Sequence, residues 1–431
     1  MVPLVPVIPV AWVGHVPSRR IMMRMSGNTA SAIAILALVV ASGAPALRGQ
    51  VTVEPTQAVA SDLDQALDAI TEAGMPGALA RVSDEATSWR GASGVADIDT
   101  NRPMRPDFPF RIGSITKTFV ATLVLQHVAE GRIGLDDPIA LHLPDVLPAE
   151  LGGAVTIRML LNHTSGVPDY DTLLWRENAD LERHRFALFT PIQLIELALT
   201  DEPGTPGQTW AYSNTNYILL GILVERVSGH SVQFDMIQRI IRPLQLRGTW
   251  FPYLSPYLLA PHSESYVPVG TPERPLVDFS VYTPTVFSAA GAMVSTAQDL
   301  ERFFRALLTG ELLPPEQLRA MQTTVSTDFG LEYGLGLVKF SLCDTFWGHD
   351  GVVWGQQTIS FTSADGQRHV TLGTNMSHYA AGPNPIDQAS TQFLLQAACP
   401  TAPMTTLSGT WPRTPAPGRQ LPQRPARLRD W

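Results

Sequence analysis

One segment of the chain places a lysine three residues after a serine: Phe110-Arg111-Ile112-Gly113-Ser114-Ile115-Thr116-Lys117. The chain has 30 Lys and Arg residues, and Lys117 and Lys339 are the two lysines among them. An arginine stays protonated in a protein, whereas a desolvated lysine can lose its proton and act as a base. Ser-x-x-Lys is the spacing at which such a lysine activates a serine. The segment therefore predicts Ser114 as a nucleophile and Lys117 as its base.

Residues 114–130 are expected to form a buried helix that begins at this serine. Apolar side chains cover nearly all of its sides, at Ile115, Phe119, Val120, Leu123, Val124 and Val128, and such a helix is normally buried. Gly131 follows at the position of a C-terminal cap. Residues i and i+3 share a helix face, so Lys117 can reach Ser114, and burial lowers the lysine pKa. The alternative, a surface serine and lysine on an amphipathic helix, conflicts with these apolar surroundings.

The composition is that of a globular protein with an acidic balance. Of the 431 residues, 45% are hydrophobic and 16% are charged, and this length allows a sizeable core in one large domain or two ordinary ones. The net charge is -9 and the isoelectric point is near 5.6. Both values argue against nucleic acid or an anionic membrane as the main partner.

Residues 1–46 are expected to be a secretory signal. Arg19, Arg20 and Arg24 precede an apolar run over residues 30–40, and small residues follow up to Ala46, after which cleavage is predicted. The apolar run is short for a transmembrane helix, so we expect no stable membrane span after signal removal. A retained anchor, a twin-arginine signal at residues 18–20 and a start at a methionine between residues 22 and 25 are open alternatives. The expected location is secreted or in the cell envelope.

The two cysteines, Cys343 and Cys399, are candidates for a disulfide. Export favours pairing, because exported proteins with an even number of cysteines usually pair them. Two free, buried thiols are the alternative. Two cysteines without a closely spaced pair of histidines do not suggest a zinc site, and we expect no metal and no cofactor.

The pattern of apolar residues predicts strands near both ends of the chain and helices between them. Helices are expected at 62–73, 191–199, 217–228, 296–309 and 387–397, and strands at 77–82, 88–98, 333–340, 352–362 and 369–374. Asp365-Gly366 reads as a hairpin turn. The expected fold class is α/β (α+β), with one antiparallel sheet built from N- and C-terminal parts and flanked by helices.

This pattern gives a predicted domain organisation. A hydrolase domain is expected over about residues 60–400, with a mostly helical inserted subdomain over about 132–285 that forms the other wall of a cleft. Residues 401–431 are rich in proline and arginine without periodicity. They are expected to be disordered or to be removed by processing.

Two further motifs carry polar side chains suited to catalysis. Tyr212-Ser213-Asn214 follows a turn-rich segment, and a phenol beside a lysine ammonium can ionise below its usual pKa and shuttle protons. Asn214 offers a donor and an acceptor for orienting an amide. His349-Asp350-Gly351 stands just before the strand expected from Val352, and glycine at a strand edge lets a ligand approach the backbone. A packed tyrosine in a turn and a lone histidine in a loop are the alternatives.

Taken in order, Ser114-x-x-Lys117, Tyr212-x-Asn214 and His349-x-Gly351 resemble the serine beta-lactamase-like family, which includes class C beta-lactamases and D-alanyl-D-alanine carboxypeptidases. The segments at 160–166, 212–217 and 333–337 agree with this resemblance, which spans roughly residues 60–400. A third motif that begins with histidine makes the chain more similar to the secreted actinobacterial carboxypeptidases. The fold implied is that of beta-lactamases and transpeptidases.

The resemblance implies a role for each matching residue. Ser114 would form an acyl-enzyme with Lys117 as the acylation base. Tyr212 would relay the proton to the leaving amine and later activate water. The backbone N–H of Ser114 and one from the strand after Gly351 would form the oxyanion hole.

Substrate binding is implied less clearly, because the chain departs from the family there. Asn214 would hold the acyl-side amide of the substrate, and His349 would complete the polar network near Tyr212. The carboxypeptidases read a terminal carboxylate with hydroxyls in the third motif and an arginine further on. This chain has Asp350 next to Gly351, and it has Lys339 as the remaining candidate for the missing arginine. An aspartate would repel a substrate carboxylate.

The expected function is therefore that of a secreted serine hydrolase acting through an acyl-enzyme. The first reading is a D-alanyl-D-alanine carboxypeptidase-like peptidase that binds a small peptide or beta-lactam. An esterase, D-aminopeptidase or beta-lactamase on the same scaffold is the alternative that Asp350 favours. A non-catalytic penicillin-binding module is the third reading, and the intact serine, lysine, tyrosine and asparagine argue against it.

Overall fold

The computed structural model describes residues 57–258, 260–327, 330–378 and 384–400. These residues belong to one compact unit that spans Val51–Trp431. The predicted signal segment and the predicted C-terminal tail lie outside the described residues. Within the described part of the chain, no helix is both long and apolar enough to cross a membrane.

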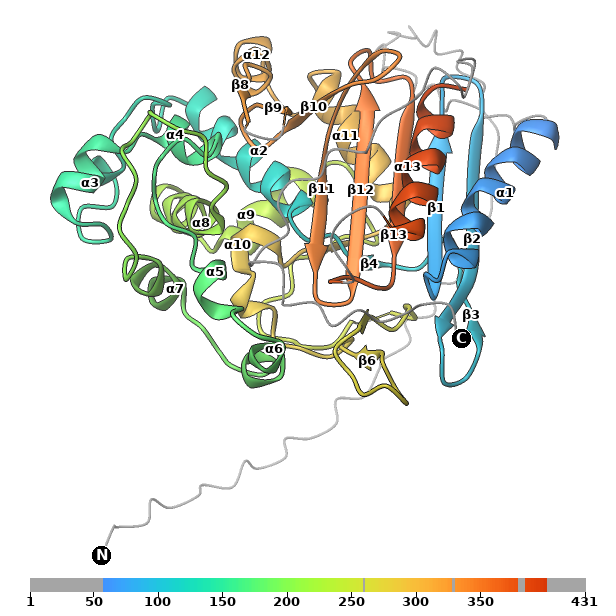
Figure 1. Ribbon diagram of the computed structural model, residues 1–431. Helices are drawn as coiled ribbons and strands as arrows, with labels where there is room; N and C mark the ends of the chain where they lie inside the picture. Colours follow the sequence, from blue (N-terminus) through green and yellow to red (C-terminus); the bar gives the residue numbers. More distant parts are fainter. Residues whose placement is uncertain (1–56, 259, 328–329, 379–383, 401–431) are drawn as a thin grey trace, which may run out of the picture. The chain divides into compact units, whose positions relative to one another are not determined.

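A nine-stranded antiparallel sheet is the centre of the unit (Figure 1). Its order is β3-β2-β1-β13-β12-β11-β10-β9-β8. The N-terminal strands are β1 (Gly77–Ser83), β2 (Ser88–Asp97) and β3 (Arg102–Pro103). The C-terminal strands are β8 (Val325–Ser326), β9 (Glu332–Tyr333), β10 (Val338–Ser341), β11 (Thr345–Val353), β12 (Gln356–Ser363) and β13 (His369–Thr374). The predicted α+β fold class is confirmed.

The two ends of the chain meet inside this sheet. Strand β1 pairs with β13 from Ala78↔Thr374 to Ser83↔His369, although these residues are nearly 300 positions apart in the sequence. The helical part of the unit comes mostly from the residues between β3 and β8. The sheet can therefore assemble only when the terminal segments come together, which is a long-range pairing.

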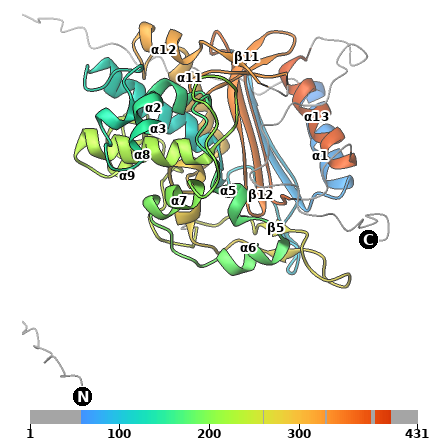
Figure 2. The ribbon, with the colours of Figure 1, turned by 60° about the vertical axis from the view of Figure 1, so that its left-hand side comes forward.

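Helices cover both faces of the sheet (Figures 1 and 2). Helices α1 (Gln57–Glu72) and α13 (Pro385–Ala398) lie on one face, and α2 (Ile115–Ala129) and α11 (Ala297–Leu308) lie on the other. Alternate residues of a strand point to opposite faces. Val338, Phe340 and Ile359 accordingly belong to the hydrophobic cluster under α1 and α13, whereas Trp347 and Val353 belong to the cluster around α2.

The helical part lies beside the β11 side of the sheet (Figure 1). Its helices are α3 (Ala149–Ala154), α4 (Ile157–Leu161), α5 (Asp171–Leu174), α6 (Asn178–His184), α7 (Pro191–Ala198), α8 (Asn214–Ser228) and α9 (Val232–Met236), followed by the short helix α10 (Ser288–Gly291). Helix α12 (Pro315–Met321) precedes β8. Two small sheets pair β4 (Phe110–Arg111) with β7 (Val294–Ser295) and β5 (Tyr266–Val267) with β6 (Val277–Asp278). Short 3-10 or π-helical turns occur at Ile139–Leu141, Ile237–Ile241 and Pro284–Val286.

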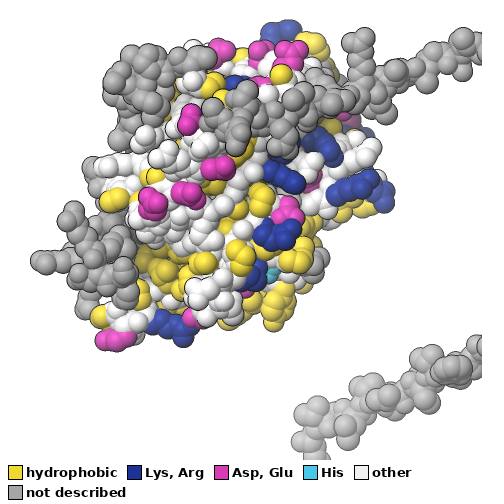
Figure 3. Space-filling model, turned by 90° about the vertical axis from the view of Figure 1, so that its right-hand side faces the viewer, with side chains coloured by type: hydrophobic (Ala, Val, Ile, Leu, Met, Phe, Trp, Pro, Cys, Tyr) yellow, Lys and Arg dark blue, Asp and Glu magenta, His cyan; other side chains and the backbone are white. Residues whose placement is uncertain are grey.

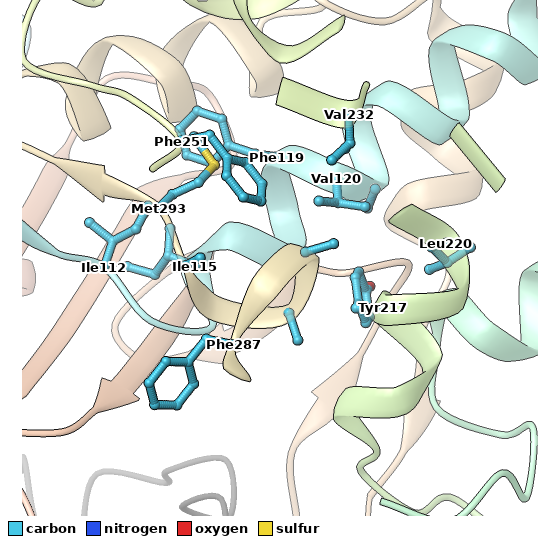
Figure 4. Packing of buried hydrophobic residues seen from close by; sticks show 14 of the residues in the cluster. Ile112, Ile115, Phe119, Val120, Tyr217, Leu220, Val232, Phe251, Phe287 and Met293 are labelled. Carbon is cyan, nitrogen blue, oxygen red and sulfur yellow. The ribbon is translucent and has the colours of Figure 1, made fainter. Parts of the chain in front are cut away.

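Helix α2 is buried on nearly all sides, as its sequence predicts. Phe119 stacks on Phe303 of α11 with ring centroids 3.6 Å apart, and Figure 4 shows further apolar side chains around α2. Gly131 has a φ of 68°. The N–H groups of Gly131 and Arg132 bond to the carbonyls of Val128 and His127, the double bond of a Schellman cap. This rigid helix fixes the residues at its N-terminus.

Two strand predictions were wrong in detail. The run 352–362 is not one strand, because β11 ends at Val353 and β12 begins at Gln356. Gly355, with a φ of 78°, makes the hairpin turn between them. The run 333–340 is likewise broken by Gly336, with a φ of 70°. His349-Asp350-Gly351 consequently lies within β11 rather than before a strand, and its residues alternate between the two faces of the sheet.

The C-terminal part contains a disulfide, and the surface of the molecule carries charges of both signs. Cys343 and Cys399, the predicted pair, form a disulfide with Cα atoms 5.9 Å apart. It joins the β10–β11 connection to the end of α13. On the face shown in Figure 3, acidic, basic and hydrophobic side chains alternate without a field of one sign.

Candidate active site

Ser114 and Lys117 occupy the first turn of α2 and face each other. Ser114 precedes the first helical residue and is 5% exposed, and Lys117 is fully buried. Lys117 Nζ lies 3.1 Å from Ser114 Oγ, 2.7 Å from Asn214 Oδ1 and 2.8 Å from the carbonyl oxygen of Ala290. All three donor positions of the ammonium therefore have an acceptor.

The environment of Lys117 makes it a base near neutral pH. Burial lowers the pKa of Lys117 to about 7, and Asp169, Asp171 and Asp350 raise that pKa by less. None of its three hydrogen-bond acceptors carries a charge. A charged amine without a direct counter-ion is disfavoured in a desolvated site, so Lys117 can take a proton from Ser114.

Tyr212 is placed beside the reacting pair. The centroid of its ring lies 4.8 Å from Lys117 Nζ and 4.3 Å from the ring centroid of His163. Its hydroxyl is buried. Burial raises the pKa of Tyr212 well above its ordinary value, and the nearby Ser114 hydroxyl lowers that pKa by less. The expected ionisation of this phenol below its usual pKa is wrong, because the desolvation of the hydroxyl outweighs the effect of Ser114. Tyr212 is a proton donor in the resting site.

Asn214 stands at the first position of α8 and connects Lys117 to Asp169. Its Oδ1 accepts from Lys117, and its Nδ2 donates to Asp169 Oδ2 at 3.1 Å. Both ends of the Asn214 amide are thus occupied within the protein. The role implied for Asn214 by the resemblance, holding the acyl-side amide of a substrate, would require one of these bonds to be shared.

The start of α2 and strand β11 approach each other closely at two glycines. A Cβ added to Gly351 would lie 2.0 Å from the Ile112 carbonyl oxygen and 2.9 Å from the Ser114 nitrogen. A Cβ added to Gly113, which has a φ of 53°, would lie 2.7 Å from the Val352 nitrogen. Only glycine allows this approach. It brings the backbone nitrogens of Ser114 and Val352 into one region, where two N–H groups can stabilise an oxyanion.

The edge of β11 next to this region has no strand partner among the described residues. Pairing of β11 with β10 ends at Gly348↔Val338, whereas pairing with β12 continues to Val353↔Gln356. Beyond Gly348, the strand that pairs with β11 within the described part of the chain is therefore β12. A strand edge without a strand partner can bind an extended substrate by backbone hydrogen bonds.

His349 is fully buried in β11. Its Nε2 bonds to the Tyr333 hydroxyl at 2.9 Å, and the ring centroids of Tyr333 and His163 lie 5.0 Å apart. Burial lowers the pKa of His349 to about 3, so the imidazole is neutral. His349 is thus bonded to Tyr333, and its part in a polar network near Tyr212 stays a prediction.

Asp350 and Lys339, the two residues predicted to select the substrate, lie in strands β11 and β10. Asp350 is directly opposite Ile359 in the sheet; Ile359 packs under α1 and α13, and opposite residues share a face. Asp350 lines a small cavity there with Ser390 and Leu394 of α13. Lys339 Nζ forms an ion pair with Glu332 at 2.7 Å, and its part as a replacement for the missing arginine stays a prediction.

The sequence did not indicate three residues of the site: His163 and Asp171, which are buried, and Asp169, which is partly buried. Asp169 and Asp171 follow the predicted 160–166 segment, and His163 lies within it. His163 Nδ1 accepts from the Ser213 backbone N–H at 3.2 Å and contacts Asn216 Nδ2 at the same distance. The available signal was two aspartates inside the otherwise apolar run 167–174. Among the described residues, no group of three or more histidine, cysteine or acidic side chains is placed to hold a metal ion.

Comparison with known proteins agrees with this geometry. A sequence model of the Beta-lactamase family matches residues 59–389. The chain belongs to the Beta-lactamase family. It is 32% identical over 290 residues to esterase EstB of Burkholderia gladioli, covering 60% of this chain and 73% of that protein. It is 29% identical over 261 residues to penicillin-binding protein 4* of Bacillus subtilis (strain 168), covering 57% of this chain and 55%, about half, of that relative.

Solved structures of the Beta-lactamase family give the same result. The crystal structure of a D-stereospecific amidohydrolase from Streptomyces sp. superposes with a TM-score of 0.72 at 37% identity, covering 80% of this chain and 99% of that one. The chain is thus a serine hydrolase of the beta-lactamase superfamily.

Proposed function

We propose that the chain hydrolyses amides and esters of D-amino acids through an acyl-enzyme on Ser114. The observation that carries the proposal is the fully buried Lys117, bonded to Ser114 and to two neutral acceptors. In this setting Lys117 Nζ takes the proton of Ser114 Oγ as that oxygen attacks the substrate carbonyl carbon. The negative charge that develops on the substrate oxygen is directed to the backbone N–H groups of Ser114 and Val352.

Collapse of the tetrahedral intermediate needs a proton on the leaving group. The protonated Tyr212 hydroxyl supplies it as the carbon–nitrogen or carbon–oxygen bond breaks, and the Lys117 ammonium returns a proton to Tyr212. Water then attacks the acyl carbonyl carbon as its proton passes to the neutral Lys117 amine, and Lys117 gives this proton to Ser114 Oγ as the bond between that oxygen and the acyl carbon breaks. The acid is released and the resting proton distribution is restored.

The charges around the site favour a substrate that has no free carboxylate next to the carbonyl group that Ser114 attacks. Two cationic side chains among the described residues that could attract a substrate carboxylate already have partners in the protein. Arg111 donates to the carbonyls of Pro256 and Ser280, and Lys339 is paired with Glu332. Asp169 and Asp350 add negative charge near Lys117. A terminal carboxylate would find repulsion without a matching cation, whereas an amide or ester is neutral. Similarity to the Streptomyces amidohydrolase and to the Burkholderia esterase supports this choice.

A carboxypeptidase activity is the second candidate, and similarity to a penicillin-binding protein favours it. A panel of D-phenylalanine amide, L-phenylalanine amide, p-nitrophenyl acetate, a D-Ala-D-Ala peptide and a labelled penicillin separates the two. We expect turnover of the D-amide and the ester, loss of both in Ser114→Ala, and little cleavage of the D-Ala-D-Ala peptide. Cleavage of the D-Ala-D-Ala peptide alone would establish the carboxypeptidase reading instead. Absence of turnover and of acylation by every reagent would contradict both.

We also infer that the chain works outside the cytoplasm. The disulfide between Cys343 and Cys399 supports this location, because structural disulfides persist in oxidising compartments. Expression of the full chain in a bacterial host, followed by fractionation and N-terminal sequencing, tests it. A mature protein that begins after Ala46 outside the cytoplasm is the expected result, and an unprocessed cytoplasmic protein with reduced cysteines would contradict it.

A further inference from the structure

We propose that Asp169 is a positioning residue that turns the Asn214 amide toward Lys117 and holds a negative charge behind it. The inference rests on the proposed function, because it assigns a part in that reaction to a residue outside the three sequence motifs. Asp169 belongs to the connection between α4 and α5, on the helical side of the site.

Asp169 binds Asn214 twice, and this double contact fixes the residue. Its Oδ1 accepts from the backbone N–H of Asn214 at 3.1 Å, and its Oδ2 accepts from Asn214 Nδ2 at 3.1 Å. The first bond also satisfies an N–H at the start of α8, where a carboxylate is favoured. Because one carboxylate holds both the backbone and the side chain of Asn214, the amide has little freedom to rotate.

The orientation of this amide decides what Lys117 meets. With Nδ2 bound to Asp169, the opposite end of the amide is the oxygen, and it accepts from Lys117 Nζ at 2.7 Å. A flipped amide would place two N–H donors against the lysine, where an acceptor is needed. An uncharged residue in place of Asp169 that could not accept both hydrogen bonds from Asn214 would allow either orientation of the Asn214 amide.

The loop that carries Asp169 is itself held against α8. The carbonyl oxygen of Pro168 accepts from Thr215 Oγ1 at 2.7 Å and from Ser213 Oγ at 3.2 Å. The N–H of Tyr170 donates to Thr215 Oγ1 at 3.1 Å. These contacts flank Asp169 on both sides, so the position of its carboxylate is set by the fold rather than by a flexible side chain.

The acidic groups facing Lys117 come from two directions. Asp169 and Asp171 lie on the helical side, and Asp350 acts from β11. Burial raises the pKa of Asp169 to about 6 and holds that of Asp171 well above its usual range. Asp169 is thus largely ionised near pH 7, and burial favours the neutral form of Asp171 more strongly than that of Asp169.

The remaining titratable neighbours of Lys117 are uncharged at this pH. Burial lowers the pKa of His163 well below its usual range and that of His349 to about 3. Burial also raises the pKa values of Tyr212, Tyr217 and Tyr333. The ionised Asp169 therefore stabilises the charged form of Lys117 and raises the pH at which it becomes a base.

Asp169→Asn tests both parts of the proposal, and Asp171→Asn is its matched control. The dependence of kcat/KM on pH is measured for wild type and variants with a neutral ester substrate, and thermal unfolding verifies that each variant is folded. In wild type the ascending limb reports Lys117. Asp169→Asn removes the charge and is expected to move this limb to lower pH by roughly one unit, and to lower kcat about tenfold or more through the freed amide. Asp171→Asn is expected to move the limb less than Asp169→Asn, because burial raises the pKa of Asp171 well above its usual range and so disfavours its charged form.

Asp169→Glu provides a second test, which can be used even when the Asp169→Asn variant does not fold. It keeps the charge but shifts the carboxylate, so kcat falls while the ascending limb stays near its wild-type pH. A limb that does not move in folded Asp169→Asn, that moves equally in Asp171→Asn, or that moves in Asp169→Glu would overturn the proposal. Failure of the proposed function would appear differently, as a wild-type protein without ester turnover or with turnover that survives Ser114→Ala.

Discussion

Lys117 shows why the choice of a single residue type matters in this chain. Elsewhere the chain takes its positive charge from arginine, apart from Lys339. Lys117 is fully buried and has no carboxylate among its three hydrogen-bond partners. An arginine would stay charged in this position, whereas a lysine can release its proton near neutral pH. The scarcity of lysine in the sequence and the burial of Lys117 in the structure therefore both indicate that Lys117 acts as a base.

Lys117→Arg is expected to lower kcat/KM for ester hydrolysis by about 10³-fold, because a guanidinium cannot act as the general base. Lys339→Arg is the matched control: it changes the chain's other lysine, which forms a partly exposed pair with Glu332, and should keep wild-type activity. Steady-state kinetics of both variants check this, with thermal unfolding to verify the fold. Equal activity of Lys117→Arg and wild type would contradict the role of Lys117.

For single residues, the sequence predicted contacts between residues that are close along the chain. Ser114 and Lys117 are one helical turn apart, so spacing alone predicted their contact. Asp169 reaches Asn214 across 45 positions, and no local pattern indicates such a contact. The pKa direction of Tyr212 was also mispredicted, because desolvation depends on surroundings that only the folded chain shows.

Among the elements, the approach of α2 to β11 builds the site. The N-terminus of α2 carries the nucleophile, β11 lies next to it, and Gly113 and Gly351 allow the two backbones to meet. The small helix α10 closes the third side, where the Ala290 carbonyl accepts from Lys117. The geometry of the oxyanion region is therefore a property of element packing.

Gly351→Ala tests this packing. A methyl group 2.0 Å from the Ile112 carbonyl must push β11 away from α2, at a cost of about 1–3 kcal/mol in the free energy of unfolding. The displaced N–H groups should lower kcat/KM by about 10²-fold. Gly153→Ala is the control, since Gly153 lies on α3 with nothing within 4 Å of an added Cβ. Equal effects of the two substitutions on kinetics and urea unfolding would refute the argument.

The periodicity of apolar residues predicted which segments form helices and which form strands. It did not predict the two turns at Gly336 and Gly355. The helices at α1, α2, α7, α11 and α13 occur where the sequence predicted them. The run that contains Val353 and Gln356 reads as continuous strand, because β-forming residues flank a single Gly355. One glycine at positive φ is enough to reverse the chain, and a pattern of apolar residues does not register it.

At the scale of the whole molecule, the sheet depends on segments from both ends of the chain. Strands β1 and β13 pair in its centre, so the site between α2 and β11 exists only after the termini have met. The disulfide acts at the same scale, because it closes a loop with a sequence separation of 56 and ties α13 to the β10–β11 connection. Its role is to hold this end of the sheet rather than to take part in the reaction.

Replacing both cysteines by serine, Cys343→Ser with Cys399→Ser, should lower the free energy of unfolding by about 2–4 kcal/mol, since the unfolded chain gains freedom. Activity at 25 °C should stay within about twofold of wild type, because neither cysteine contacts the site residues. Urea unfolding and ester kinetics of the double variant check both statements. Unchanged stability, or a large loss of activity in the folded variant, would contradict this division of roles.

The fold class followed from the order of elements and from the motifs, whereas substrate preference did not. A sheet built from both ends with helices between them was predictable from periodicity. The face to which Asp350 points, and the pairing of Lys339 with Glu332, depend on strand register, which a one-residue shift would reverse. The surroundings of Asp350 and Lys339 therefore could not be read from the sequence.

The central claim is that Ser114, activated by Lys117, forms a covalent acyl-enzyme. Rapid acid quench after mixing with a p-nitrophenyl ester or penicillin, followed by intact and tandem mass spectrometry, tests it directly. The predicted result is one acyl group per chain, located on Ser114, absent from Ser114→Ala and slow to form in Lys117→Arg. Substrate turnover without an adduct on Ser114, or an adduct that persists in Ser114→Ala, would contradict the claim.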